Sequence, residues 1–256
     1  MGYETLLLER QGHVAILTLS RPPTNSVSYA MLGELDKVFD EVAADREARA
    51  LVITGAGDRC FCAGMDVADA ISHPEVGEVG RALWTKVDLF EKPTIAAING
   101  HALGGGCELA LACHFRFMAE NPKAFMGCPE INLGIIPGWG GTQRMTRLLG
   151  RSKALDLMLN ARRLSPGEAF AVGLVDRLFA PEQLMTQVME IATSLSERAP
   201  LSARAIIKAS TAFMYKGIEE GLKAEAEGSK VCVASKDATE GFTAFMEKRK
   251  PVFKGE

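Results

Sequence analysis

The sequence places short apolar stretches directly before glycine-containing loops, and helical segments follow these loops. Residues 50–54 are an aliphatic stretch that ends at Gly55, and residues 94–98 run into a glycine cluster. Residues 28–45 carry apolar side chains at helical spacing, and a second helix is expected over residues 76–90. Such strands, alternating with helices, favour β-to-α units and an α/β fold over an all-helical bundle. A chain of 256 residues is long enough to bury a substantial core.

The N-terminal region and one later helix carry strong local signals. Residues 3–9 and 13–20 are rich in aliphatic and β-branched side chains, which predicts a β-hairpin. Ser165 and Glu168 match a capping box, and Pro166 occupies the first helical position. A helix is therefore expected to begin at Pro166.

The C-terminal quarter has a different character. From about Pro181 the chain is expected to be helical to its end, with breaks at Pro200 and Gly217. We therefore predict two parts, an α/β core of residues 1–195 and a helical appendage of residues 196–256.

Composition excludes several classes of function. The formal net charge is −3, from 29 basic and 32 acidic residues, so the chain has no general attraction for nucleic acid. Cys60 and Cys62 form a C-x-C pair, but no second pair and no nearby histidine completes a zinc site, and we expect no bound metal. No segment approaches the roughly 20 apolar residues that span a bilayer. The N-terminus lacks a signal-peptide pattern, so a cytoplasmic protein with reduced thiols is expected.

A run of three glycines, residues 104–106, stands just before Glu108 in the stretch NGHALGGGCELA. The dinucleotide fingerprint fails because Leu109 occupies the third glycine position, and no Gly-Lys-Ser/Thr follows to make a P-loop. Two readings remain open. The glycines either leave backbone N–H groups bare for a ligand or let the turn pack tightly against a neighbouring strand. A helix that starts near Gly106 would aim its positive end at an oxygen that gains negative charge.

Two further stretches favour a ligand. CFCAGMD supplies a second small-residue turn at Ala63 and Gly64, and PEINLGIIPGWGGTQR supplies a second acid, Glu130, followed by another glycine-rich turn. The patterns A-G-x-D, G-x-A-x-G-G-G-x-E and P-E-x-x-x-G-x-x-P-G-x-G-G occur in this order. Together they resemble the crotonase (enoyl-CoA hydratase/isomerase) superfamily, and the resemblance covers essentially the whole chain.

The resemblance implies a fold and an assembly. It implies a crotonase-like spiral of β-β-α units with a helical C-terminal trimerisation segment, and a homotrimer or a hexamer made of two trimers. The implied substrate is an acyl-CoA, with no cofactor beyond the coenzyme A that the substrate carries. Nucleic-acid and membrane partners are not implied.

The resemblance also implies roles for residues of the site. The backbone N–H groups of Ala63 and Gly105 would hold the thioester carbonyl oxygen. Glu108 would orient and activate a water molecule, Glu130 would protonate C2 of the acyl chain, and the backbone of Gly138 would help to hold the water.

Coenzyme A needs a path and cationic partners. By resemblance, the path is lined by the loop of Ala63, Gly64, Met65 and Asp66. Lys254 belongs to a basic C-terminal cluster that would present charge to the phosphates of the coenzyme. A solvated basic tail is the alternative interpretation of this cluster.

The implied activity is that of an enoyl-CoA hydratase, which adds water across the 2,3 double bond to give a 3-hydroxyacyl-CoA. The alternative is a double-bond isomerase or another enzyme on this scaffold that acts on a branched or cyclic acyl group. An isomerase needs one base, so the second glutamate argues against it. The net charge and the acid pair disfavour a non-enzymatic CoA- or RNA-binding role. The stretch NPKAFMGCPE is slightly longer than the family's usual run, which predicts a small loop or bulge before Glu130.

Overall fold

The computed structural model describes residues 2–256, so Met1 of the predicted core lies outside it. Its main sheet has the strand order β1-β2-β3-β5-β7-β9. β1 and β2 pair antiparallel, which confirms the predicted hairpin, and every later pair is parallel. The strands are β1 (Leu6–Gln11), β2 (Val14–Leu19), β3 (Ala50–Gly55), β5 (Thr94–Ile98), β7 (Phe115–Ala119) and β9 (Arg177–Phe179). All residues of β3 and β5 are buried, as the continuous apolar stretches predicted.

A second sheet of three parallel strands, in the order β4-β6-β8, lies beside the first. Its strands are β4 (Cys60–Cys62), β6 (His101–Leu103) and β8 (Met126–Gly127), and each follows one strand of the main sheet along the chain. The successive pairs β3-β4, β5-β6 and β7-β8 are each followed by a helix, which is the predicted spiral of β-β-α units. Glycines stand where the turns of the spiral meet. A Cβ on Gly55, Gly100 or Gly127 would lie 2.3 Å from a backbone oxygen.

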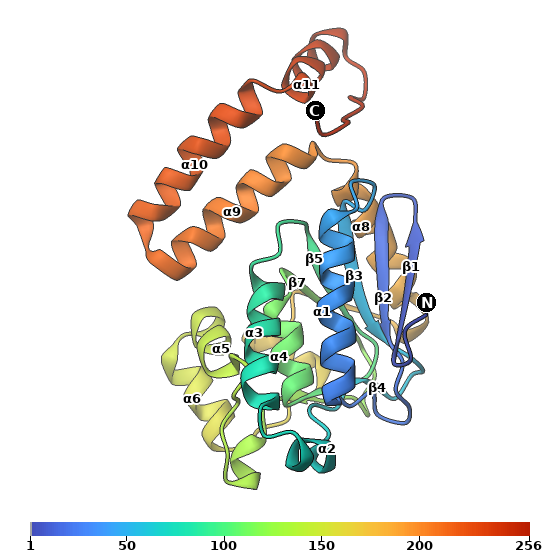
Figure 1. The fold of residues 1–256 in the computed structure, drawn as a ribbon, viewed down its shortest axis with the longest axis vertical. Coiled ribbons are helices and arrows are strands. Elements are labelled where there is room, and N and C mark those ends of the chain that lie inside the picture. The colour runs from blue at the N-terminus through green and yellow to red at the C-terminus, as the bar shows by residue number, and fades with distance from the viewer. Residues whose placement is uncertain (1) are drawn as a thin grey trace.

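Helices cover both faces of the main sheet. Figure 1 shows α1 (Tyr29–Ala44), α3 (Val76–Asp88) and α4 (Gly105–Ala112) side by side on one face. On the other face, buried side chains of α8 (Leu184–Ser196) pack against alternate residues of the strands. The remaining helices of the core are α2 (Val67–Ser72), α5 (Gly141–Leu149), α6 (Arg151–Leu159) and α7 (Pro166–Val172). Two short 3₁₀ turns, η1 (Glu130–Leu133) and η2 (Pro181–Gln183), complete it. The capping box of Ser165 and Glu168 is present at the start of α7.

The C-terminal helices project from the core (Figure 1). They are α9 (Pro200–Lys216), α10 (Ile218–Val233) and α11 (Lys236–Glu247), and the breaks expected at Pro200 and Gly217 are confirmed. The expectation of helix to the chain end is wrong for residues 248–256. Asp237 accepts hydrogen bonds from the N–H groups of Lys254 and Gly255, at 2.7 and 2.8 Å, and so holds the tail in a non-helical path. The functional division at residue 195 stays a prediction.

Within residues 2–256, none of the helices combines the length and the apolar character that crossing a membrane requires.

Candidate active site

Glu108 lies in the first turn of α4 and is 2 % exposed. The helix begins at Gly105, one residue earlier than expected, directly after Gly104. Gly104 has φ +53° and ψ −128°, a conformation that residues with a Cβ rarely adopt. A Cβ on Gly106 would lie 2.1 Å from the carbonyl oxygen of Cys62 in β4. Tight packing against β4 therefore explains the glycine at position 106.

The backbone donors near Gly105 differ from the expected pair. The N–H group of Ala63 donates to the carbonyl of Thr24 at 3.1 Å, so it is not free to hold a thioester oxygen, and its proposed role is not supported. Among the hydrogen bonds of residues 2–256, none uses the N–H group of Met65 or that of Gly105. A Cβ on Gly64 would lie 3.3 Å from the nitrogen of Gly105, which places the two turns against each other.

The carboxylate of Glu108 is anchored by the turn that precedes α5. Its Oε1 accepts hydrogen bonds from the N–H groups of Trp139, at 2.8 Å, and Gly141, at 2.7 Å. A Cβ on Gly141 would lie 2.9 Å from Cγ of Glu108, so this close approach requires glycine. Burial raises the pKa of Glu108 to about 7, and the charge of Glu130 adds to the rise, while the two N–H donors and Arg144 oppose it.

Glu130 begins η1 and is 9 % exposed. Both of its carboxylate oxygens are buried without a hydrogen-bond partner, and burial raises its pKa. Its Oε1 lies 3.3 Å from the place that a Cβ on Gly104 would take, so the carboxyl faces the start of α4. Burying a carboxyl without a hydrogen-bond partner costs free energy, and such groups are typical of sites that bind a ligand or take up a proton.

The longer stretch before Glu130 forms a short turn, closed by a 2.9 Å hydrogen bond from the N–H of Ala124 to the carbonyl of Asn121. The chain then enters β8, and Glu130 reaches the same site as Glu108. The expected loop is present and does not displace the second acid.

Gly138 lies beside this carboxylate pair, one residue before Trp139. Its carbonyl accepts a hydrogen bond from Nε of Arg81 at 3.1 Å. Its N–H group makes no hydrogen bond within residues 2–256. Its role in holding water stays a prediction.

Two tryptophans support the start of α4, and sequence reasoning did not anticipate this. Nε1 of Trp84 donates to the carbonyl of Gly105 at 2.9 Å. The ring of Trp139 fills the space where a Cβ on Gly105 or Gly80 would stand. The two rings pack edge to face with centroids 5.3 Å apart, so Gly105 is held on two sides.

The residues expected along the coenzyme path divide into two groups. The first group is the loop after β4, residues 63–66, which lies beside the start of α4. In this loop Asp66 caps α2 and pairs with Arg21 at 2.7 Å. That pairing lowers the pKa of Asp66. Asp66 therefore has a structural role, and its place on the coenzyme A path stays a prediction.

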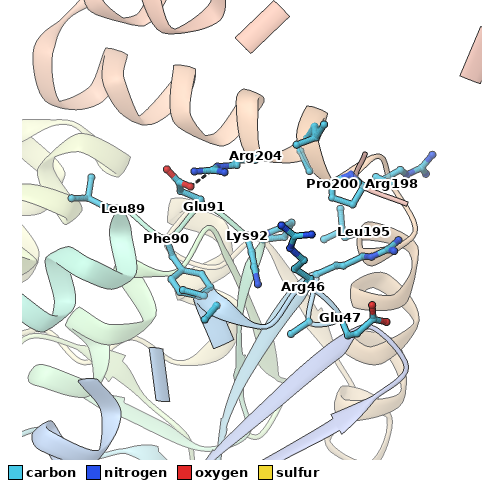
Figure 2. Close-up of a pocket in the computed structure, with 18 of the residues that line it drawn as sticks. Arg46, Glu47, Leu89, Phe90, Glu91, Lys92, Leu195, Arg198, Pro200 and Arg204 are labelled. Atoms are coloured by element: carbon cyan, nitrogen blue, oxygen red, sulfur yellow. Dashed lines mark ion pairs between the residues drawn. The ribbon is translucent and has the colours of Figure 1, made fainter. Parts of the chain in front are cut away.

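Within a single chain, Lys254 does not line the same site as the loop of residues 63–66. It lines a cavity of about 1040 Å³ between the core and the start of α9. Neither Glu108 nor Glu130 lines that cavity. Figure 2 shows the cavity, with Arg204 of α9 reaching across to Glu91.

Residues 2–256 hold no group of three or more His, Cys, Asp or Glu side chains arranged for a metal ion. Cys60 and Cys62 are buried in β4, and burial raises the pKa of the Cys62 thiol to about 12.

Comparisons with known proteins agree with this fold. Residues 9–256 match the family described as Enoyl-CoA hydratase/isomerase. A crotonyl-CoA hydratase of Syntrophomonas wolfei is 40% identical, over 99% of both chains. A short-chain-enoyl-CoA hydratase of Clostridium acetobutylicum is 38% identical, over 98% of this chain and 97% of the relative. The crystal structure of an enoyl-CoA hydratase from Bacillus anthracis superimposes with a TM-score of 0.95 at 36% identity, over 99% of this chain and 100% of that one. The fold and the resemblance predicted from the sequence are confirmed.

Proposed function

Because the chain belongs to the enoyl-CoA hydratase/isomerase family, we propose that it adds water across the 2,3 double bond of a short enoyl-CoA thioester through Glu108 and Glu130. The prediction of an enoyl-CoA hydratase, a hydro-lyase, is confirmed by the family match and by full-length relatives with hydratase names. One observation carries the proposed mechanism. Two buried carboxyls with raised pKa values lie beside a helix start whose first N–H group is free.

The thioester oxygen is held by the N–H groups of Met65 and Gly105 in this proposal. Neither group is engaged elsewhere, whereas that of Ala63 is. The positive end of α4 points to the same place, so negative charge that develops on the oxygen is stabilised there. Trp84 and Trp139 keep Gly105 in position, so this donor needs no rearrangement during the reaction.

The two glutamates then divide the proton transfers. Glu108 uses Oε1 for its two backbone donors, which leaves Oε2 to take the proton of water as the water oxygen bonds to C3. The electron pair of the double bond moves toward the thioester carbonyl, and Glu130 delivers a proton to C2. The pair as a whole gains and loses no proton, because one acid receives the proton that the other supplies.

Relatives named for crotonyl-CoA and short-chain enoyl-CoA support a short acyl group. The ring of Trp139, 4 % exposed and packed on Gly105, limits the space beside the reacting carbons. The reaction needs no cofactor in this proposal, because the substrate carries its own coenzyme A.

The assembly is proposed to be a homotrimer or a hexamer. The three C-terminal helices project from the core and expose large apolar side chains, among them Phe242, Phe245 and Met246 of α11. Lys254 lies in that part of the chain and lines a cavity that neither Glu108 nor Glu130 lines, which supports a role for Lys254 at the coenzyme A of a neighbouring subunit. The cytoplasmic location expected from the sequence stays a prediction.

The test follows the loss of enoyl-thioester absorbance with crotonyl-CoA for the wild type, Glu108→Gln and Glu130→Gln. Each variant is expected to lose roughly 10²- to 10⁴-fold in kcat, because each removes one proton-transfer group. Glu190→Gln, a change of an exposed glutamate on α8, is the control and keeps full activity. An inactive wild type would refute the proposed substrate, and an active Glu108→Gln or Glu130→Gln would refute the two-acid mechanism.

A further inference from the structure

A chain of hydrogen bonds joins the C-terminal helix α9 to the anchored carboxylate of Glu108. It begins at Tyr215, whose hydroxyl donates to Oδ2 of Asp88 at 2.6 Å. Asp88 is the last residue of α3 and is 7 % exposed. Arg147 donates to its other oxygen at 2.9 Å, and the guanidinium of Arg147 also lies over the ring of Tyr215. The hydroxyl of one residue on α9 is thereby fixed to a buried carboxylate of the core.

Arg144 carries the connection onward and is 4 % exposed. Its Nε donates to Asp88 at 2.9 Å, its Nη1 to the carbonyl of Trp139 at 2.8 Å, and its Nη2 to the carbonyl of Trp84 at 3.1 Å. Gly140 makes room for this fork. It has φ +107°, and a Cβ there would lie 2.1 Å from Nη1.

The two carbonyls that Arg144 binds belong to the two residues that support the site. Trp139 donates its N–H to Glu108, and Trp84 donates its indole N–H to the carbonyl of Gly105. One guanidinium therefore fixes both the turn that anchors Glu108 and the helix that supports Gly105.

A purely stabilising role explains this arrangement less well. Burying an ion pair such as Asp88–Arg144 costs desolvation energy that well-packed apolar side chains would avoid. The fork geometry of arginine instead gives directional bonds to several partners at once. Here those partners are the ones whose orientation the proposed reaction needs.

We propose that Asp88, Arg144 and Tyr215 are positioning residues, which set the orientation of Glu108 and Gly105 and make it depend on the seating of α9 against the core. The inference rests on the proposed function for its catalytic consequence. The hydrogen-bond chain itself exists independently of substrate.

The charged and titratable groups around Glu108 set its pKa, which is the quantity that the test measures. They are Glu130 on η1, Arg144 on α5, and the thiol of Cys128 just after β8, whose pKa is raised so that it is neutral near pH 7. When the Trp139 turn loosens, Glu108 loses N–H donors that favour its charged form, and its pKa rises further. The acid limb of kcat/KM should then move to higher pH.

The experiment compares Tyr215→Phe and Arg144→Lys with two matched controls. Tyr3→Phe also removes a hydroxyl that donates to a carboxylate, that of Glu41 at 2.9 Å. Arg116→Lys also alters a buried fork that binds a carboxylate and two carbonyls, those of Asp176, Leu174 and Cys113. Within residues 2–256, no hydrogen bond or ion pair joins either control residue to Trp139, Asp88 or Arg144.

Each variant is assayed for kcat, KM and pH profile with crotonyl-CoA, and its Glu108 carboxyl is titrated by carbon NMR, with Glu108→Gln used to assign the signal. Tyr215→Phe is expected to lower kcat about tenfold, and Arg144→Lys up to about a hundredfold, with KM changed less than about threefold. In both variants the Glu108 titration moves to higher pH, and in both controls it does not.

Unchanged Glu108 titration in Tyr215→Phe and Arg144→Lys would overturn the inference, even when their thermal stability falls. The same conclusion would follow if the controls shifted the titration equally. The NMR titration needs no substrate, so the hydrogen-bond chain is tested even if crotonyl-CoA is not turned over. A wild type that does not turn over crotonyl-CoA would refute only the proposed substrate.

Discussion

At the scale of single residues, burial acts on two glutamates with unequal support. Both carboxyls lie in the core with raised pKa values, but Oε1 of Glu108 accepts two backbone N–H donors and Glu130 accepts none. The donors bring the pKa of Glu108 part of the way back. Two neighbouring acids with such different surroundings are suited to opposite protonation states, and so to the roles of base and acid.

The pH dependence of hydration follows from these surroundings. Glu108 must be ionised to accept a proton from water, and its pKa is about 7, so kcat/KM is expected to fall as the pH drops below about 7. Glu130 must be protonated, and burial raises its pKa, so activity also falls as the pH rises through that raised pKa. Initial rates with crotonyl-CoA across this range check both limbs. A flat profile between about pH 5.5 and about pH 8 would contradict the assignment of a buried base.

Because its pKa is raised, ionised Glu108 lowers the stability of the folded protein at high pH. Its pKa is raised in the folded state from 4.5 to about 7, so its stabilising contribution is complete below pH 4.5 and is lost as the pH rises through about 7. Glu108→Gln removes the charge and keeps an oxygen for both N–H donors. The variant should be more stable than the wild type by on the order of 2 kcal/mol at about pH 8, and by less at about pH 5. Urea unfolding at the two pH values measures this difference, and an equal difference at both would exclude the explanation.

Local motifs predicted Glu108, Glu130 and Gly105 as site residues, because each lies within a short stretch with its own signature, and the structure brings the three together. That the N–H group of Ala63 is engaged could not be predicted from the sequence, because its acceptor, the carbonyl of Thr24, reaches it through a tertiary contact. The partners of Asp88 were hidden for the same reason. Arg144 and Tyr215 stand 56 and 127 positions away along the chain.

At the scale of helices and strands, predictions succeeded where the signal was local. The helix expected over residues 28–45 is α1, the capping box starts α7, and Gly217 separates α9 from α10. The strands of the second sheet were missed because two or three residues are too few to show a periodicity. The non-helical tail was missed because Asp237 fixes it by contacts that depend on the folded chain.

Two glycine-to-alanine changes test backbone conformation at this scale. Gly217 has φ +88° and ψ 178°, a region open almost only to glycine, whereas Gly77 lies in the helix α3. A Cβ on either glycine would meet no atom within 4 Å, so steric contact does not distinguish them. Gly217→Ala should lower the free energy of unfolding by about 1–3 kcal/mol through backbone strain. Gly77→Ala should raise it by up to about 1 kcal/mol, because alanine favours the helix. Thermal melts distinguish the two, and a shift of the same sign in both would contradict the argument.

At the scale of the whole molecule, the projecting helices expose more apolar surface than a lone subunit is expected to leave in water. Phe242 and Phe245 of α11 are 72 % and 80 % exposed. Their exposure is the reason for proposing that they are buried between the subunits of a trimer or a hexamer.

Light scattering after size-exclusion chromatography tests this assembly. The wild type should elute with the mass of three or six chains, and Phe245→Glu should shift the mass toward that of one chain, since a charge cannot be buried cheaply at an apolar contact. Leu7→Glu, at an exposed position of β1, is the control and should leave the mass unchanged. A wild-type protein with the mass of a single chain would refute the assembly.

The glycines where the turns of the spiral meet also constrain how descendants of this gene can diverge. Any missense mutation at the codons of Gly55, Gly100 or Gly127 adds at least a methyl group, which would meet a backbone oxygen that cannot move aside. Selection for folding alone would remove such alleles, whichever acyl group the enzyme accepts. Duplicated copies are therefore free to acquire new substrates through side chains around the pocket, while the path of the backbone is inherited unchanged. A saturation library scored only for soluble expression would reveal these codons without any assay of catalysis.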